Sequence, residues 1–411
     1  MRSILHCDMN NFYASVERLF DNSLIGVPVA VCGEEELRHG IVLAKSEEAK
    51  RCGVKTGDTV WQAKEKCPSI RIVPTHFERY VKYSRLASAI YKEYTPLVEP
   101  FGMDECWLDV TASRLAFGNG VEIGEKIRQR VKRELGLTLS VGVSFNKVFA
   151  KLGSDMKKPD ALTHIPFEKF QEMTGGLPVE EMLGVGRKTA AVLHRYGIHT
   201  LAQLACADEE FLALQFGKTG ADLKRCARGE DESPVVPVEA AAPMKSVGHG
   251  LTVSRDLTTS EEVWTLILAL CQDVGAKLRL YGFQARGIAL ECKDKRFFHK
   301  TLQKQLTAPT DCTITLAKEA FSLFQGRYEF REPLRSVTVR AISLEPAGGV
   351  QLSLFQSTEE SRALVLDKVT DSLRNRYGKG AVLPARLLTA STPDFHGYIP
   401  FRGTEKEPEP N

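Results

Sequence analysis

The sequence predicts a multidomain α+β protein, and three observations lead to this prediction: the order of the first elements, a composition break near residue 234, and a length of 411 residues. A chain of this length is long enough for several domains. Hydrophobic periodicity over residues 3–143 alternates strands and helices in the order β-α-β-β-α-β. That order is the split pattern of ferredoxin-like sheets.

Each element of this first unit is predicted from its residue pattern. Apolar runs and alternating residues indicate strands, and apolar residues at helical spacing indicate helices. We place the elements at residues 3–8 (strand), 80–94 (helix), 96–101 (strand), 105–110 (strand), 121–135 (charged helix) and 138–143 (strand). Gly102 supplies the turn between the second and third strands.

Three carboxylates are expected to meet at one end of this sheet. In the split pattern the strand at 105–110 pairs antiparallel with the strand at 3–8, so Asp8 meets Asp104 and Glu105. A pocket of carboxylate oxygens suits Mg²⁺. Two such ions about 3.5–4 Å apart are the usual apparatus of in-line phosphoryl transfer. The alternative is that Asp8 only caps the following helix and that the acidic pair only forms a hairpin turn.

Composition excludes some classes of protein. No stretch has the pattern of a transmembrane span or a secretory signal, so we expect a cytoplasmic protein with no membrane partner. Ten cysteines without a C-x-x-C pair predict neither disulfides nor a zinc site. The net charge of +3, from 55 basic and 52 acidic residues, neither demands nor excludes nucleic acid.

Aromatic residues follow the first carboxylate by one helical turn. Phe12 and Tyr13 lie where a ring could pack under the sugar of a nucleotide and clash with a 2′-hydroxyl. Such a clash would select deoxynucleotides by sterics. The alternative is ordinary core packing where a strand passes into a helix.

Residues 8–13 (DMNNFY) and 102–109 (GMDECWLD) resemble the two acidic motifs of the Y-family translesion DNA polymerases. The resemblance extends from the first residues to about Phe355. It implies that Asp8 and Asp104 are ligands of two Mg²⁺ ions, that the Met9 carbonyl adds an oxygen, and that Glu105 completes the catalytic set. It also implies that Tyr13 discriminates the sugar.

The same resemblance implies a domain layout. We expect a palm at 1–19 and 75–166, fingers at 20–74, a thumb at 167–233, a linker at 234–243, a separate α/β little finger at 244–345, and a tail at 346–411. The stretch of residues 230–243, which contains the linker, is predicted to be an exposed tether because it is charged and then rich in proline and alanine.

Residues 142–159 also match the family, and within them Lys158 falls on the position that contacts the incoming triphosphate. A point charge suits phosphate neutralisation. Lys147 and Lys151 lie one turn apart on the helix of this segment, and such lysines usually form a solvated face.

This sequence departs from the family at three positions. Asn10 stands where the family commonly has an aspartate, which removes a negative charge near the metals. Glu47 and Lys50 stand where the family has the tyrosine and arginine that grip the triphosphate. A glutamate there would repel phosphate. Either Lys45 or Arg51 takes over, or nucleotide binding is weaker than usual.

Two segments are predicted to hold DNA. Residues 177–193 have the pattern of a helix-hairpin-helix, in which Gly184, Gly186 and the start of the second helix, with Lys188, approach a phosphate. The alternative is a tight turn between two helices. A basic run in the second α/β segment predicts a clamp on the DNA backbone, and it consists of Lys293, Lys295, Arg296, Lys300 and Lys304.

Residues 351–355 (QLSLF) resemble the sliding-clamp-binding peptide of bacterial polymerases, with Gln351, Leu352, Leu354 and Phe355 as the contacts. The alternative is that Leu352 and Phe355 begin a helix that runs to Tyr377.

We therefore expect a monomeric, template-directed, low-fidelity DNA polymerase without proofreading, which binds primer-template DNA, a dNTP and the replication sliding clamp. Two other classes remain. A nucleotidyl cyclase would share the metal site but would have no use for the DNA-holding segments. A non-catalytic DNA-binding accessory protein derived from such polymerases would fit the unusual Glu47.

Overall fold

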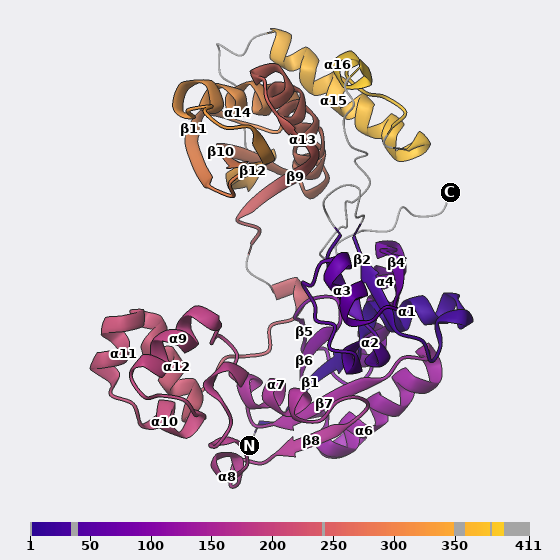
Figure 1. Cartoon of the computed structure of the whole chain (residues 1–411), viewed down its shortest axis with the longest axis vertical. Helices are drawn as coiled ribbons and strands as arrows, with labels where there is room; N and C mark the ends of the chain where they lie inside the picture. Colours follow the sequence, from indigo (N-terminus) through magenta and orange to yellow (C-terminus); the bar gives the residue numbers. More distant parts are fainter. Residues whose placement is uncertain (1, 34–39, 241–242, 349–357, 379, 390–411) are drawn as a thin grey trace. The chain divides into compact units, whose positions relative to one another are not determined.

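The computed structural model describes residues 2–33, 40–240, 243–348, 358–378 and 380–389. These residues form two compact units (Figure 1). The first unit holds residues 2–33 and 41–240, and the second holds the described residues from 243 onward.

A mixed sheet of five strands forms the centre of the first unit. Its order is β5-β6-β1-β7-β8. The strands are β1 (Ile4–Met9), β5 (Val98–Pro100), β6 (Glu105–Asp109), β7 (Leu139–Ser144) and β8 (Leu162–Ile165). The four strands predicted from the sequence are confirmed, and β1 pairs antiparallel with both β6 and β7. The fifth strand, β8, was not predicted and runs parallel to β7.

Alternation along the strands sends apolar side chains to a helix-covered face. The covering helices are α1 (Phe12–Phe20), α4 (Phe77–Lys92) and α6 (Gly120–Arg130), and the last continues as a π-helical turn, Val131–Leu135. Leu5, Cys7 and Leu108 pack there against helix residues such as Tyr80 and Ile123. This cluster is the main core of the first unit.

Helix α7 (Lys147–Met156) packs on the opposite face at very short range. A Cβ atom added to Gly142 in β7 would lie 1.8 Å from the Ala150 carbonyl oxygen of α7. Only glycine permits this approach. Because the helix rests directly on the strand, the lysines along α7 are held at a fixed height above β1 and β6.

A smaller three-stranded sheet forms a second subregion of the first unit. Its order is β3-β2-β4. Its elements are β2 (Val29–Cys32), β3 (Val42–Lys45), α2 (Glu47–Arg51), α3 (Val60–Lys66) and β4 (Arg71–Pro74). It has a small core of its own, which includes Ala30, Val42 and Ala63. The Ser46 side chain caps α2 by accepting a hydrogen bond from the Ala49 amide.

Short helices follow the central sheet and surround their own apolar cluster. They are α8 (Phe170–Thr174), α9 (Arg187–Arg195), α10 (Leu201–Cys206), α11 (Glu209–Phe216) and α12 (Lys218–Ala227). The helix predicted before the Gly-x-Gly turn is only one 3₁₀ turn, Val179–Glu181. Pro178 precedes this turn and Gly184 follows it, which leaves little room for a longer helix.

The stretch after α12 differs from the exposed tether that was predicted. Val235 is only 4 % exposed and packs with Ile4, Trp107 and Ala150. The Val236 amide donates a hydrogen bond to the Glu99 carboxylate at 2.8 Å. The start of this stretch is therefore held to the first unit, because Val235, which lies between the charged residues 230–232 and the alanine-rich end of the stretch, fits a hydrophobic site.

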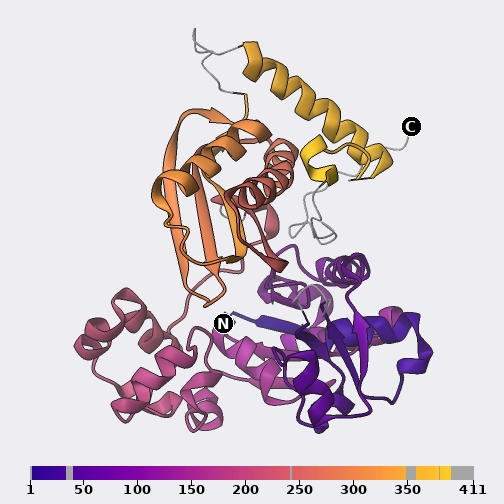
Figure 2. The same cartoon turned by 45° about the horizontal axis from the view of Figure 1, so that its top comes forward.

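The second unit is a four-stranded antiparallel sheet covered by helices on one face (Figure 2). The sheet order is β11-β10-β12-β9. The elements are β9 (Ser246–Leu257), α13 (Ser260–Tyr281), β10 (Phe283–Asp294), β11 (His299–Thr310), α14 (Thr313–Arg327) and β12 (Leu334–Pro346). The α/β character predicted for this segment is confirmed.

Helices α15 (Thr358–Tyr377) and α16 (Ala385–Thr389) complete the second unit. Arg279 of α13 forms ion pairs with Asp367 at 3.2 Å and Asp371 at 2.6 Å, so α15 is anchored through a nearly buried guanidinium. Residues 351–355, the predicted clamp-binding peptide, lie outside the described residues. Among the helices that the structure describes, none is both long and apolar enough to traverse a lipid bilayer.

Candidate active site

The sheet brings the three predicted carboxylates to one end. Asp8 and Glu105 are direct partners in the antiparallel pairing of β1 with β6. Asp104 immediately precedes β6, and its backbone carbonyl accepts a hydrogen bond from the Met9 amide at 3.0 Å. The convergence expected from the strand order is therefore present in the backbone.

Asp8 is paired with a lysine from a distant part of the chain. Its carboxylate is buried, and Lys158 Nζ lies 2.5 Å from its Oδ2 atom. Lys158 also contacts Asp155 at 2.8 Å. Burial raises the pKa of Asp8, although Lys158 partly opposes that shift. Burial alone would lower the pKa of Lys158, but its two carboxylate partners outweigh burial and raise that pKa.

Glu105 is held by two basic side chains. Lys151 Nζ lies 2.5 Å and His6 Nε2 lies 3.3 Å from its carboxylate. Burial opposes ionisation, but hydrogen bonds from His6 and Lys151 lower the pKa of Glu105 to about 2. Glu105 is therefore an anion at neutral pH.

Sequence reasoning missed these partners of Glu105. His6 was treated only as a strand residue, yet its Nδ1 lies 2.8 Å from Ser154 Oγ on α7. The solvated face predicted for the α7 lysines is wrong, because Lys147 pairs with Glu99 at 2.7 Å and the Lys151 side chain is 16 % exposed. Their one-turn spacing was visible in the sequence, but the helix packing that buries them was not.

Asp104 differs from the other two carboxylates. No side chain among the described residues forms a hydrogen bond or an ion pair with it. Burial and then the nearby charges of Asp8 and Glu105 raise the pKa of Asp104 to about 6. The end of the sheet thus carries a half-buried acidic group with which no cationic side chain among the described residues forms an ion pair.

This donor set fits a divalent cation. Hard carboxylate oxygens are the ligands that Mg²⁺ prefers, and a positive ion would relieve the repulsion between Asp104 and Asp8. In the arrangement described by the structure, however, no three His, Cys, Asp or Glu side chains are close enough to share one ion. Lys158 and Lys151 instead satisfy Asp8 and Glu105.

Tyr13 lies beside this acidic end on α1. Its ring stacks on Tyr80 with centroids 4.1 Å apart and planes 9° apart, and its hydroxyl lies 3.6 Å from the Met103 sulfur. The Tyr80 hydroxyl in turn donates to the buried Glu17 carboxylate at 2.6 Å. Tyr13 is thus held in place by a packed and hydrogen-bonded neighbour.

Phe12 does not share that position. It is 3 % exposed and belongs to the main core of the first unit. The Phe12 ring therefore packs in the core, and its contact with a substrate stays a prediction. Its position after the left-handed residue Asn11 turns it toward the sheet while Tyr13 remains half-buried at the surface.

Asn10 has a structural task in place of the aspartate expected from the family. Its side-chain Nδ2 donates a hydrogen bond to Ser140 Oγ at 2.9 Å, and its side-chain Oδ1 accepts one from the Asp160 backbone amide at 2.8 Å. Asn10 therefore ties β7 to the loop that carries Lys158. A neutral amide suits this position because it donates and accepts at once.

Glu47 is held by a neighbour of the carboxylate site. The Asn11 amide donates to the Glu47 carboxylate at 3.0 Å, and Lys50 Nζ lies 3.8 Å from the same carboxylate. Lys50 is half-exposed, so its charge is available to solvent and to Glu47 together. Lys45 reaches Thr56 instead, at 3.2 Å.

The residues predicted to approach DNA phosphate lie on the surface. Gly184, Gly186 and Lys188 are all exposed, and Gly184 has a φ of 95°, which favours glycine. Gly186 is the N-cap of α9, so the amides of its first turn face solvent.

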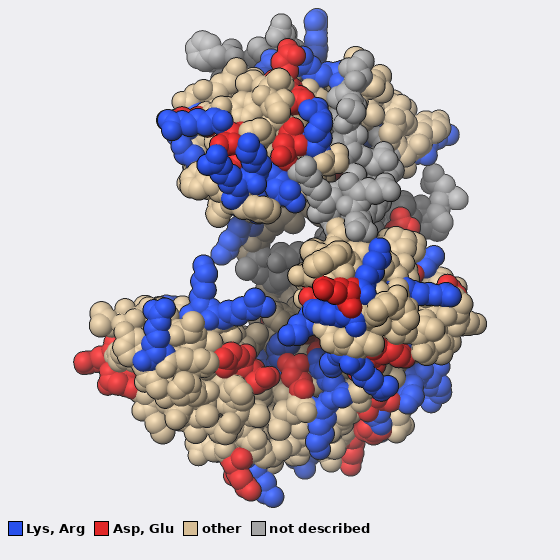
Figure 3. Space-filling model, viewed as in Figure 1, with Lys and Arg blue, Asp and Glu red and all other residues tan. Residues whose placement is uncertain are grey.

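The basic run of the second unit lies on and around the β10–β11 hairpin. Lys293 lies next to the last residue of β10. Lys295 Nζ and Arg296 Nη2 lie 3.0 and 2.7 Å from the Glu332 carboxylate oxygens. Figure 3 shows Lys and Arg side chains gathered over the strands of this unit. One acidic residue between two cations leaves the hairpin tip with a positive excess.

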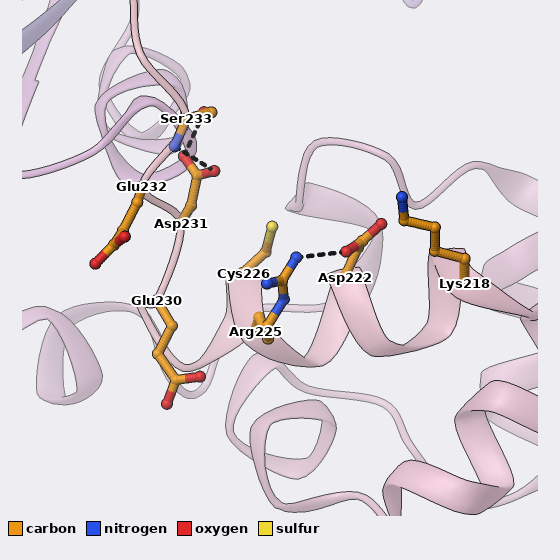
Figure 4. A pocket seen from close by; sticks show the side chains of 8 residues that line it. All are labelled: Lys218, Asp222, Arg225, Cys226, Glu230, Asp231, Glu232 and Ser233. Carbon is orange, nitrogen blue, oxygen red and sulfur yellow. Dashed lines mark hydrogen bonds and ion pairs between the residues drawn. The ribbon is translucent and has the colours of Figure 1, made fainter.

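A polar pocket beside α12 is separate from the carboxylates (Figure 4). It is lined by Lys218, Asp222, Arg225, Cys226, Glu230, Asp231, Glu232 and Ser233. Asp222 is already paired with Arg225 at 2.6 Å. Acidic groups outnumber basic ones in this lining, which disfavours a phosphate ligand.

Comparison with family models gives two matches. The impB/mucB/samB family model matches residues 7–155, and the model of the C-terminal domain of the same family matches residues 244–354. The first match contains all three carboxylates, and the second contains the sheet of the second unit.

Comparison with individual proteins gives relatives over nearly the whole chain. DNA polymerase IV of Acetivibrio thermocellus is 46 % identical over 391 residues, which cover 94 % of this chain and 98 % of the relative. DNA polymerase IV 1 of Bacillus subtilis is 37 % identical, with 93 % of each chain covered. Among solved structures, the Y-family DNA polymerase chimera Dbh-Dpo4(243-245)-Dbh has a TM-score of 0.74 at 23 % identity, covering 83 % of this chain and 98 % of the chimera.

The structural likeness shows the fold, and the sequence matches show the family. These relatives are DNA polymerases and match the chain over 98 % and 93 % of their own length. The matches therefore favour a polymerase over a nucleotidyl cyclase or a non-catalytic accessory protein. The chain belongs to the impB/mucB/samB family of Y-family translesion DNA polymerases, and it is a DNA-directed DNA polymerase of the DNA polymerase IV type.

Proposed function

We propose that the acidic end of the central sheet is where the α-phosphate of a dNTP is joined to a primer 3′-hydroxyl, with release of pyrophosphate. The observation that carries this proposal is Asp104, a half-buried carboxylate that forms no ion pair with a cationic side chain of the described residues and lies beside Asp8 and Glu105.

In this proposal two Mg²⁺ ions are held by the Asp8, Asp104 and Glu105 carboxylates and the Met9 carbonyl. Such a pair of ions, when bound, activates the attacking hydroxyl and neutralises charge on the phosphates. The sheet contributes preorganisation. Asp8 and Glu105 are registered strand partners, so their separation is fixed by backbone hydrogen bonds rather than by a loop.

The lysines have a second task in this proposal. Lys158 forms an ion pair with Asp8 in the structure. Once the carboxylate is otherwise satisfied, the Lys158 ammonium is free to bind triphosphate oxygens. Lys151 remains on Glu105 and holds its orientation. Lys50, whose ammonium lies 3.8 Å from the Glu47 carboxylate, supplies a weaker contact to the phosphates.

Tyr13 discriminates the sugar in this proposal. Its ring is braced by Tyr80, so it cannot move aside to admit a 2′-hydroxyl without breaking the stack. A steric barrier needs such rigidity to be effective.

The domain roles follow the element order. We assign the palm to the five-stranded sheet, the fingers to the three-stranded sheet, the thumb to helices α8–α12 and the little finger to the second unit. The fingers have two short helices, α2 and α3, so they cover a nascent base pair only loosely. Low fidelity and synthesis without proofreading are part of the proposal.

Contacts to partners complete the proposal. A DNA phosphate is bound by Gly184, Gly186 and Lys188. The DNA backbone is also bound by Lys293, Lys295 and Arg296. The sliding clamp is bound by residues 351–355. The protein acts as a monomer.

The test is primer extension on intact and abasic templates with purified wild type, Asp104→Ala and the surface control Asp222→Ala. We expect wild type and Asp222→Ala to extend both templates and Asp104→Ala to lose at least ~10³-fold in rate while still binding DNA, because removal of a transition-state contact leaves binding intact. Activity of Asp104→Ala within tenfold of wild type would remove this carboxylate from the catalytic set.

A further inference from the structure

The turn between β10 and β11 carries two adjacent exposed aromatic side chains. Phe297 is 58 % exposed and Phe298 is 65 % exposed, and both lie in the connection between Asp294 and His299. Neither belongs to the core of the second unit or to the side chains packed against it. The core of this unit therefore does not account for these two rings.

The turn is built around the buried carboxylate of Asp294. Its Oδ1 atom accepts hydrogen bonds from the Arg296 amide at 2.8 Å and the Phe298 amide at 3.0 Å. The Phe297 amide donates to the Asp294 carbonyl at 3.0 Å, and the Asp294 amide donates to the Phe298 carbonyl at 2.9 Å. These bonds fix the backbone on both sides of the ring pair.

Phe297 has a left-handed backbone, with a φ of 66°. Such a conformation is unfavourable for a bulky non-glycine residue and persists only where neighbouring contacts impose it. The hydrogen bonds of Asp294 impose it here. As a result, the Phe297 backbone is fixed at the turn, and more than half of its side chain remains exposed.

Cations surround the ring of Phe297. Lys293 Nζ lies 5.1 Å and Arg335 Cζ lies 5.0 Å from the ring centroid, within the range of a cation–π contact. Lys295 and Arg296 lie on the same turn. A protruding pair of rings among cations suits an anionic partner that has flat apolar faces. Single-stranded nucleic acid combines those two properties, because its unstacked bases bind aromatic rings and its phosphates bind Lys and Arg.

We propose that Phe297 and Phe298 form a stacking site for an unpaired nucleotide of the template strand. This inference rests on the proposed polymerase function, because template-directed synthesis requires a strand with nucleotides that are not yet paired. A duplex offers no comparable target, since neighbouring base pairs cover the faces of its bases except at the ends. The rings thus add a contact to unpaired bases beside the phosphate contacts of the lysines and arginines.

The experiment uses the full-length protein and two DNA probes with equal numbers of phosphates. One is a blunt duplex and the other is a primer-template with a 5′ overhang that carries 2-aminopurine. The variants are Phe297→Ala/Phe298→Ala, Phe297→Tyr/Phe298→Tyr, and Tyr377→Ala as a control. Tyr377 is a matched choice because it is 63 % exposed, lies in the same unit and has Arg376 over its ring at 5.3 Å.

We expect the double alanine variant to bind the overhang probe roughly 10- to 100-fold more weakly and to lose quenching of 2-aminopurine. Its affinity for the blunt duplex should remain within about twofold of wild type, because phosphate contacts are retained. The double tyrosine variant should restore the quenching, and Tyr377→Ala should match wild type. The Asp294 hydrogen bonds are made by backbone amides, so the alanine variant keeps the turn.

Unchanged affinity and quenching in the double alanine variant would overturn the stacking site. An equal loss on both probes would also overturn it, since the rings would then support the turn rather than bind a base. A Lys293→Ala/Lys295→Ala variant tests the proposed contact of these lysines with the DNA backbone separately from the stacking site. If these lysines bind the backbone, affinity falls on both probes and the salt dependence becomes shallower by about one unit per lost contact. If the double lysine variant binds both probes like wild type, these lysines do not bind the DNA backbone. The results for the phenylalanine variants can still be interpreted in that case.

Discussion

Lys158 Nζ lies 2.5 Å from Asp8 Oδ2, across a separation of 150 positions in the chain. The contact joins β1 to the loop after α7, and Asn10 secures the same loop through the Asp160 amide. Lys158 therefore occupies the carboxylate that we assign to the metals. In the proposed function, a divalent cation would compete with this lysine for the oxygen atoms of Asp8.

The first prediction follows from this competition. Lys158→Gln should lower the Mg²⁺ concentration for half-maximal primer extension several-fold, because Asp8 no longer has a competing ammonium. The same substitution should raise the KM for dNTP by about tenfold, because a charge-assisted phosphate contact is worth roughly 1.5–3 kcal/mol. Steady-state kinetics over a Mg²⁺ series measure both quantities.

The control for Lys158 is Lys157→Gln, which removes the same charge from the preceding exposed position. It should leave both quantities near the wild-type values. If Lys158→Gln changed the half-maximal Mg²⁺ concentration and the KM for dNTP in the same direction, the competition between lysine and metal would be refuted.

The second prediction concerns sugar selection. Tyr13→Ala should increase ribonucleotide incorporation at least tenfold, whereas Tyr13→Phe should retain discrimination because the ring and its stack on Tyr80 are kept. Single-nucleotide insertion with dCTP and rCTP gives the ratio. Unchanged selectivity in Tyr13→Ala would take Tyr13 out of this role.

The third prediction concerns the departure at Glu47. Glu47→Gln removes a negative charge but keeps a group that can accept the hydrogen bond from Asn11. We expect the KM for dNTP to fall by about two- to tenfold, since the repulsion of triphosphate is removed and Lys50 is released. Glu65→Gln makes the same charge change at an exposed position of α3 and should have no comparable effect. Equal KM values for Glu47→Gln and wild type would mean that Asn11 already keeps this carboxylate away from the nucleotide.

The fourth prediction concerns the segment of residues 351–355. Deletion of Gln351–Phe355 should weaken binding to an isolated sliding clamp by more than tenfold and leave primer extension on short templates unchanged. Surface plasmon resonance with immobilised clamp measures the binding. Equal binding before and after the deletion would refute the peptide assignment.

Most of the central sheet that carries the candidate site could be predicted from the sequence. The alternation in residues 3–8 and 138–143 and the turn at Gly102 were sufficient to order four strands, and the pairing of Asp8 with Glu105 followed from that order. Strand patterns are local and repeat every two residues, so they can be found without tertiary information.

Contacts that depend on how elements pack were not predictable. The proximity of His6 and Lys151 to Glu105 depends on α7 resting on Gly142, and no local pattern encodes that distance. The burial of Val235 was missed because its neighbours are charged and proline-rich, while the site that receives it is formed by β1, β6 and α7. The 3₁₀ turn at Val179–Glu181 was predicted as a helix because short helical patterns do not reveal the hydrogen-bond type.

The most direct test of the central claim is a count of bound divalent ions. We would measure Mn²⁺ stoichiometry by electron paramagnetic resonance in a ternary complex of protein, chain-terminated primer-template and dNTP. We expect two Mn²⁺ ions per wild-type protein, the loss of at least one in Asp104→Asn, and an unchanged count in Asp222→Asn. An identical count in wild type and Asp104→Asn would contradict the assignment of these carboxylates as metal ligands.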